Sequence, residues 1–157
     1  LSRLISNYPG FGRAYNHLGY IWETKFRDLR KAEEYYKSCL NYSPEYPAIY
    51  YNYAVLLSTQ ARFEELENLL TKALEVPGIN KSKIYNEFGI MYEVQGRYSE
   101  ALASYRQGIR FSFSQKDITT YRTSIQRTEE KKKFFDKGEG STPDLKGNPG
   151  DIPLDWN

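Results

Sequence analysis

The chain has 157 residues, of which 39% are hydrophobic and 27% charged, and its formal net charge is +2. This composition is typical of a folded globular protein, and the charge is too small to favour nucleic acid or an anionic membrane as a partner. A single cysteine and a single histidine exclude a disulfide framework and argue against a metal site, and no apolar run approaches the length of about 18 residues that predicts a membrane span.

The first nine residues have the pattern of a helix end that belongs to a preceding repeat. Pro9 lies 35 residues before Pro44, and the repeated segments that follow have the same spacing. In this register Leu1 and Leu4 match apolar positions of a later helix. We therefore interpret residues 1–9 as the end of a preceding repeat helix in a longer protein, and the alternative is an unrelated N-terminal capping turn.

Three segments of the chain align with one another at a period of 35 residues. Tyr15, Tyr50 and Tyr85 occupy the same position in these segments. The other columns keep a period of 34 or 35 residues: Gly19, Ala54 and Gly89; Trp22, Leu57 and Tyr92; Leu29, Phe63 and Tyr98; Ala32, Leu66 and Ala101; Tyr36, Leu70 and Tyr105; Cys39, Ala73 and Gly108. The one-residue change in period indicates a longer turn around Phe26 in the first unit. So constant a period predicts an array of structural repeats.

The apolar spacing within each unit predicts two helices. Tyr15, Leu18 and Trp22 lie on one face of a helix, and a second apolar face begins at Ala32. Short polar connectors, prolines and glycines end these helices. The small residues of the Gly19 column allow one helix of a pair to approach the other closely. We therefore expect an all-α fold with three antiparallel helix pairs, at about residues 10–44, 45–79 and 80–113.

The first unit contains aromatic, Leu-Gly, aromatic, Ala, aromatic and Pro positions in this order: Tyr15, Leu18-Gly19, Trp22, Ala32, Tyr36 and Pro44. The third unit repeats the pattern without the proline: Tyr85, Phe88-Gly89, Tyr92, Ala101 and Tyr105. This pattern resembles the tetratricopeptide repeat (TPR) family. The middle unit departs from it with Tyr53-Ala54 and Leu66. The resemblance implies a right-handed superhelix of helix pairs whose first helices line a concave, peptide-binding face.

Beyond the third unit, we expect one more helix and then an irregular tail. Residues 114–136 are expected to hold a capping helix, with Asp117 as its N-cap and Tyr121 on the face that covers the last pair. Residues 137–157 are rich in glycine and proline, a composition that predicts no helix.

The expected function is non-catalytic protein–protein interaction, in which an extended peptide of another protein binds on the concave face. By the resemblance, the contacts come from first-helix positions outside the packing columns: Arg13, Asn16, Tyr20, Tyr51, Asn52, Val55, Lys83, Asn86 and Ile90. Asparagine amides can pair with a peptide backbone, aromatic rings provide apolar contact, and cations attract carboxylates. The alternative is that these side chains are merely solvated.

Two other functions stay open. Residues 138–157 hold one lysine against four acidic residues, with apolar side chains at 152, 154 and 156. This acidic tail could occupy a groove near Arg13 and Lys83, in its own chain or a neighbouring one, as a device for self-association or autoinhibition. An RNA-binding helical repeat is a further alternative, which the nearly neutral charge disfavours.

We find no catalytic motif and expect neither enzymatic activity nor a cofactor. Paired carboxylates such as Glu33-Glu34 and Glu129-Glu130 lie on predicted outer helix faces, where solvation explains them. Cys39 occupies a packing column, so we expect a small core residue rather than a reactive thiol. The free cysteine and the lack of an export signal favour an intracellular location.

Overall fold

The computed structural model describes residues 11–137. Within this range all regular secondary structure is helical, which confirms the expected all-α class. The helices are α2 (Gly12–Thr24), α3 (Leu29–Tyr42), α4 (Pro47–Thr59), α5 (Phe63–Ala73), α6 (Lys81–Val94), α7 (Tyr98–Phe111) and α8 (Gln115–Asp136). The interpretations of residues 1–9 as a helix end and of 138–157 as an irregular tail concern residues outside the described part of the chain.

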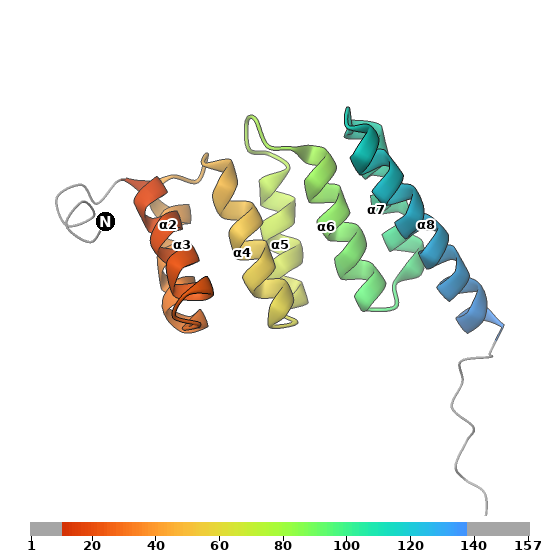
Figure 1. Ribbon diagram of the computed structural model, residues 1–157, viewed down its shortest axis with the longest axis horizontal. Helices are drawn as coiled ribbons and strands as arrows, with labels where there is room; N and C mark the ends of the chain where they lie inside the picture. The colour runs from red at the N-terminus through yellow and green to blue at the C-terminus, as the bar shows by residue number, and fades with distance from the viewer. Residues whose placement is uncertain (1–10, 138–157) are drawn as a thin grey trace, which may run out of the picture.

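The helices are arranged as consecutive pairs in one row. α2 packs mainly on α3, α4 on α5, and α6 on α7, while α2, α4 and α6 also contact one another in series. Three- or four-residue connections within each pair make its two helices antiparallel. Figure 1 shows the pairs side by side, with α8 next to α7 at the end of the row.

Local sequence explains where several helices begin. The carboxylate of Asp28 accepts a hydrogen bond from the backbone N–H of Lys31 at the start of α3, and the amide oxygen of Asn80 accepts one from Lys83 at the start of α6. Such side chains satisfy N–H groups that have no partner within the helix. Pro47 occupies the first turn of α4, where its missing N–H costs nothing.

The turns inside the pairs follow the repeat and explain the change in its period. Residues 25–28 connect α2 to α3, whereas three residues form each of the two equivalent turns, which confirms the longer turn around Phe26. The same turn position is left-handed in all three units, with φ of 55° at Arg27, 54° at Ala61 and 72° at Gly96. Only the third unit has a glycine at this position, and glycine adopts a left-handed conformation without strain.

The core lies between the two helices of each pair and between neighbouring pairs. A Cβ at Gly19 would overlap the ring of Tyr36, and a Cβ at Gly89 would overlap the ring of Tyr105. Both tyrosine side chains are fully buried. The expectation that this column allows close helix approach is therefore confirmed at the two glycines.

Carboxylates connect neighbouring pairs at equivalent positions. Glu33 on α3 accepts a 2.8 Å hydrogen bond from the Tyr53 hydroxyl and two 2.8 Å hydrogen bonds from the Arg62 guanidinium. Hydrogen bonding by Arg62 lowers the pKa of Glu33 to about 2, against the opposing effect of burial. One unit further, Glu67 accepts a hydrogen bond from Tyr92 at 2.6 Å and lies 3.7 Å from an Arg97 nitrogen.

A third carboxylate, that of Glu93 on α6, attaches α8 to the last pair. The Glu93 side chain is only 6% exposed and accepts hydrogen bonds from Tyr105 on α7 at 2.8 Å, from Arg127 on α8 at 2.8 and 2.7 Å, and from Lys131 on α8 at 2.8 Å. Hydrogen bonding by Arg127 is the main cause that lowers the pKa of Glu93 to about 2. Its two cationic partners fix the orientation of α8.

The start of α8 differs from the expectation. The N-cap is Ser114, whose hydroxyl accepts a hydrogen bond from the backbone N–H of Asp117. The prediction that Asp117 is the N-cap was therefore wrong, because Asp117 already lies inside the first turn, where its carboxylate faces the positive end of the helix dipole. Tyr121 is buried as expected and packs over Gly108, where a Cβ would lie 3.2 Å from its ring.

Candidate functional site

Exposed apolar side chains recur at one position of the first helices. Tyr20 on α2, Val55 on α4 and Ile90 on α6 are 35 residues apart, and 52%, 55% and 37% of these residues are exposed. Since α2, α4 and α6 contact one another in series, the three side chains form a row across the helices. We call the side of α2, α4 and α6 that carries this row the first-helix surface.

Two cations accompany the row near the N-terminal ends of their helices. Arg13 on α2 and Lys83 on α6 are both exposed, and neither forms an ion pair with another residue between 11 and 137. The Arg13 guanidinium lies 5.6 Å from the centre of the Tyr46 ring. Both positions can therefore attract an anionic group of a ligand.

The two asparagines of α2 and α4 are used inside the fold. Asn16 is only 4% exposed, and its amide oxygen accepts a 3.0 Å hydrogen bond from the Asn52 side chain. The expectation that Asn16 points away from the packing surfaces is wrong, since it connects α2 to α4. Asn52 is half-buried, and its donated hydrogen bond leaves only part of the amide available.

The remaining predicted positions, Tyr51 and Asn86, lie four residues before Val55 and Ile90 and form hydrogen bonds within the chain. The Tyr51 hydroxyl accepts a 2.9 Å hydrogen bond from the backbone N–H of Asn80, so this side chain supports the start of α6. Asn86 is half-buried and lies 3.5 Å from the neighbouring carboxylate of Glu87. Burial raises the pKa of Glu87. Asn86 and Glu87 together present a donor and an acceptor beside Ile90.

The structure adds Val94 to this surface. Val94 is 68% exposed and follows Ile90 by four residues on α6, so both side chains share one side of the helix. The sequence contained this signal, since Val94 lies outside the packing columns and one helical turn beyond Ile90.

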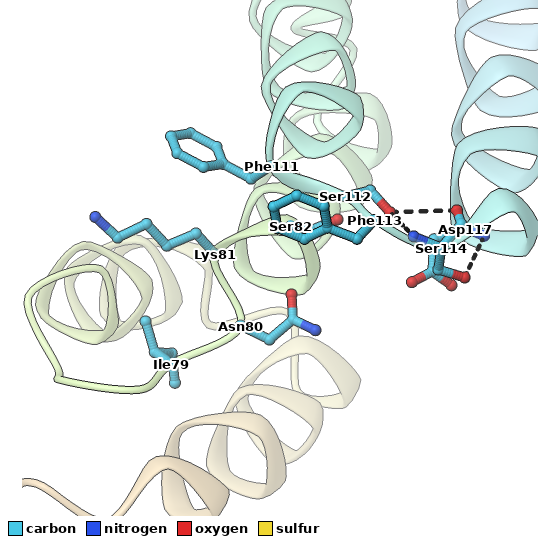
Figure 2. Close-up of a pocket in the computed structure, with 9 residues that line it drawn as sticks. All are labelled: Ile79, Asn80, Lys81, Ser82, Phe111, Ser112, Phe113, Ser114 and Asp117. Carbon is cyan, nitrogen blue, oxygen red and sulfur yellow. Dashed lines mark hydrogen bonds between the residues drawn. The ribbon is translucent and has the colours of Figure 1, made fainter.

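A hollow at the N-terminal ends of α6 and α8 is a second candidate site that sequence reasoning missed. It has a volume of about 630 Å³ and is lined by residues 79–82, 111–114 and 117. Figure 2 shows these side chains, which come from the start of α6, the end of α7 and the start of α8. Phe113 is fully exposed, whereas the neighbouring Phe111 stacks on Tyr85 with ring centres 5.5 Å apart.

The polar groups of the hollow are partly committed to the fold. The Ser82 hydroxyl is buried and donates a 2.8 Å hydrogen bond to the carbonyl oxygen of Gly108. Ser114 caps α8. Lys81 and Asp117 keep their charged groups available, since neither forms an ion pair with a residue of the described range.

Metal-ligating side chains and the single cysteine are the other groups that could carry chemistry. Within residues 11–137, no group of three or more histidine, cysteine, aspartate and glutamate side chains is placed to hold a metal ion. Cys39 is fully buried, and burial raises the pKa of its thiol to about 11, so it is protonated at neutral pH. This agrees with its expected position in the core.

Comparisons with known proteins add no family to these observations. The sequence matches no model of a protein family. A search of curated proteins finds no significant relative. Across the described helices, none combines the length and the apolar character that crossing a membrane requires.

Proposed function

We propose that the chain is a non-catalytic protein-interaction module of the TPR type, in which the first helices line the concave side of a superhelix. Its ligand is an extended segment of another protein that lies across α2, α4 and α6. The observation that carries this proposal is the row of Tyr20, Val55 and Ile90, which are exposed at the same position of three successive helices.

The exposed apolar side chains of the row can be buried by a ligand, and this supports a binding role. Isolated exposed apolar residues are ordinary on protein surfaces, whereas a periodic row across neighbouring helices gives an extended segment several contacts along its length. Arg13 and Lys83 add positive charge near one side of the row. A ligand with apolar side chains and a few acidic ones would match the apolar row and the positive charge of this surface.

The proposal is tested by selecting peptides from a displayed random-peptide library on the 157-residue chain. We expect the enriched peptides to bind with dissociation constants of about 1–100 µM, as is usual for short extended ligands. Val55→Asp places a charge in the middle of the row and should weaken this binding at least about tenfold.

A matched control is Phe113→Ser, which removes an exposed apolar side chain outside the first-helix surface. It should leave the peptide affinity unchanged. Enriched peptides that bind equally well to the wild type and to Val55→Asp would overturn the proposal, provided that circular dichroism shows both proteins to be folded.

The acidic segment of the chain is a second candidate ligand for the same surface. Its charge is opposite to that of Arg13 and Lys83, and it carries apolar side chains at 152, 154 and 156. Deleting residues 138–157 should raise the affinity for selected peptides if this segment competes with them. An unchanged affinity and an unchanged oligomeric state would remove this alternative.

A further inference from the structure

The hollow beside the start of α8 is lined by a phenylalanine with an unusually exposed side chain. Phe113 lies in the connection between α7 and α8, lines the hollow and is fully exposed, so its ring packs on nothing within the described chain. A phenylalanine side chain in this state leaves its whole apolar area in water. Transfer of such a side chain out of water is favourable, which makes Phe113 a strong anchor for a partner.

The walls of the hollow combine apolar and charged groups. Ile79 and Phe111 contribute apolar atoms, and Lys81 and Asp117 contribute opposite charges. In Figure 2, Lys81 and Asp117 lie on opposite sides of the Phe113 ring. The patch therefore carries a projecting ring, a space that can receive a ring and two charges of opposite sign.

We propose that this patch is a self-association surface whose occupant is a second copy of the same chain. In a two-fold symmetric pair, each copy inserts Phe113 into the hollow of the other. The same rotation brings Lys81 of one copy towards Asp117 of its partner, because the two charges lie on opposite sides of the ring. Such isologous contact requires that one patch be complementary to itself, as this patch is.

The patch is small, and this sets the strength of the association. Stable dimers bury more surface than a single hollow offers, so we expect a reversible dimer with a dissociation constant of roughly 10–100 µM. The surface lies at the N-terminal ends of α6 and α8 and does not include Tyr20, Val55 or Ile90. The inference is therefore independent of the proposed peptide binding.

Sedimentation equilibrium of the 157-residue chain over a concentration series tests the proposal. Phe113→Ser should raise the dimer dissociation constant by about 30-fold or more, since one anchor is lost in each copy. Phe134→Ser removes an exposed phenylalanine near the other end of α8 and should leave dimerisation unchanged. Val55→Asp should leave it unchanged as well.

A charge exchange tests the two-fold geometry itself. Lys81→Asp places two acidic side chains opposite each other, and Asp117→Lys places two lysines opposite each other, so each variant alone should dimerise at least about tenfold more weakly than the wild type. In a mixed pair of one Lys81→Asp chain and one Asp117→Lys chain, opposite charges again face each other at both contacts. The mixture should therefore associate as well as the wild type. This recovery separates a charge contact between copies from a loss of folding, which circular dichroism measures separately.

Three results would overturn the proposal. The first is a wild-type chain that stays monomeric up to about 1 mM. The second is association that Phe113→Ser does not change. The third is a mixture of the charge variants that associates no better than either variant alone, which would place Phe113 against a different surface or a different partner.

Discussion

The ring of Tyr36 on α3 occupies the space that a Cβ of Gly19 on α2 would need. The same relationship recurs between Gly89 and Tyr105 in the third pair. In the middle pair the two columns hold Ala54 and Leu70 instead, and both are buried. A smaller side chain on the second helix thus accompanies a larger one on the first, which explains why this unit departs from the others.

Gly19→Ala is expected to destabilise the fold by about 1–3 kcal/mol. The new methyl group has to displace a fully buried ring, and this cost exceeds the gain in helix propensity of about 1 kcal/mol. Urea denaturation of the wild type and the variant measures the difference.

The double variant with Tyr36→Leu copies the middle pair and should be more stable than the sum of the two single effects predicts. The double-mutant cycle then has a coupling energy of about 1 kcal/mol or more. Strict additivity of the two substitutions would contradict the packing argument.

The left-handed turn position gives a prediction with an internal control. Gly96→Ala should cost about 1 kcal/mol, because an added Cβ meets no atom within 4 Å and the penalty is conformational alone. Ala61→Gly relieves the same conformation in the middle unit and should stabilise the protein by about 0.5–1 kcal/mol. Thermal unfolding that moved in the same direction for both variants would show that backbone conformation does not control these turns.

Much of the fold could be predicted because the repeat places equivalent residues in equivalent surroundings. Gly19 and Gly89 indicated close helix contact, and the change in period indicated the longer turn around Phe26. The N-cap of α8 was misplaced because Ser114 and Asp117 are both good capping residues. Only the backbone path after α7 decides between them.

The candidate site was predicted less completely, because exposure depends on how neighbouring helices are placed. Asn16 and Asn52 belong to different units, so their hydrogen bond follows from the approach of α2 to α4 and leaves no periodic signal. Phe113 is another example. A phenylalanine in a short connection could equally cover the core, and its exposure follows from the direction in which α8 starts.

Acidification tests the role of Glu93. Its pKa in the folded protein, about 2, lies below the ordinary value of 4.5, so its contribution to stability is complete above about pH 4.5 and disappears as the pH falls towards 2. Between about pH 6 and pH 3, this carboxylate alone should account for a loss of about 2 kcal/mol. Urea denaturation at the two pH values measures it.

Glu93→Gln keeps the shape of the side chain and removes the titration. The variant should be less stable than the wild type near pH 7 and should lose about 2 kcal/mol less on acidification. A pH dependence equal to that of the wild type would mean that Glu93 is not the carboxylate responsible.

The two equivalent arginines should differ in importance. Arg62 binds Glu33 through two hydrogen bonds of 2.8 Å, whereas Arg97 lies 3.7 Å from Glu67 and both of those side chains are about 40% exposed. Arg62→Met should therefore destabilise the protein by about 2–3 kcal/mol, and Arg97→Met by less than about 1 kcal/mol. Equal effects in chemical denaturation would show that the repeat position, rather than the contact geometry, determines the contribution.

The position of a bound peptide tests the central claim most directly. A peptide selected on the chain can be titrated into isotope-labelled protein while amide chemical shifts are followed by NMR. We predict that the largest changes fall on α2, α4 and α6 around Tyr20, Val55 and Ile90. Changes confined to α3, α5 and α7 would contradict the proposed function, because the ligand would then bind to the second helices of the pairs instead of the first-helix surface.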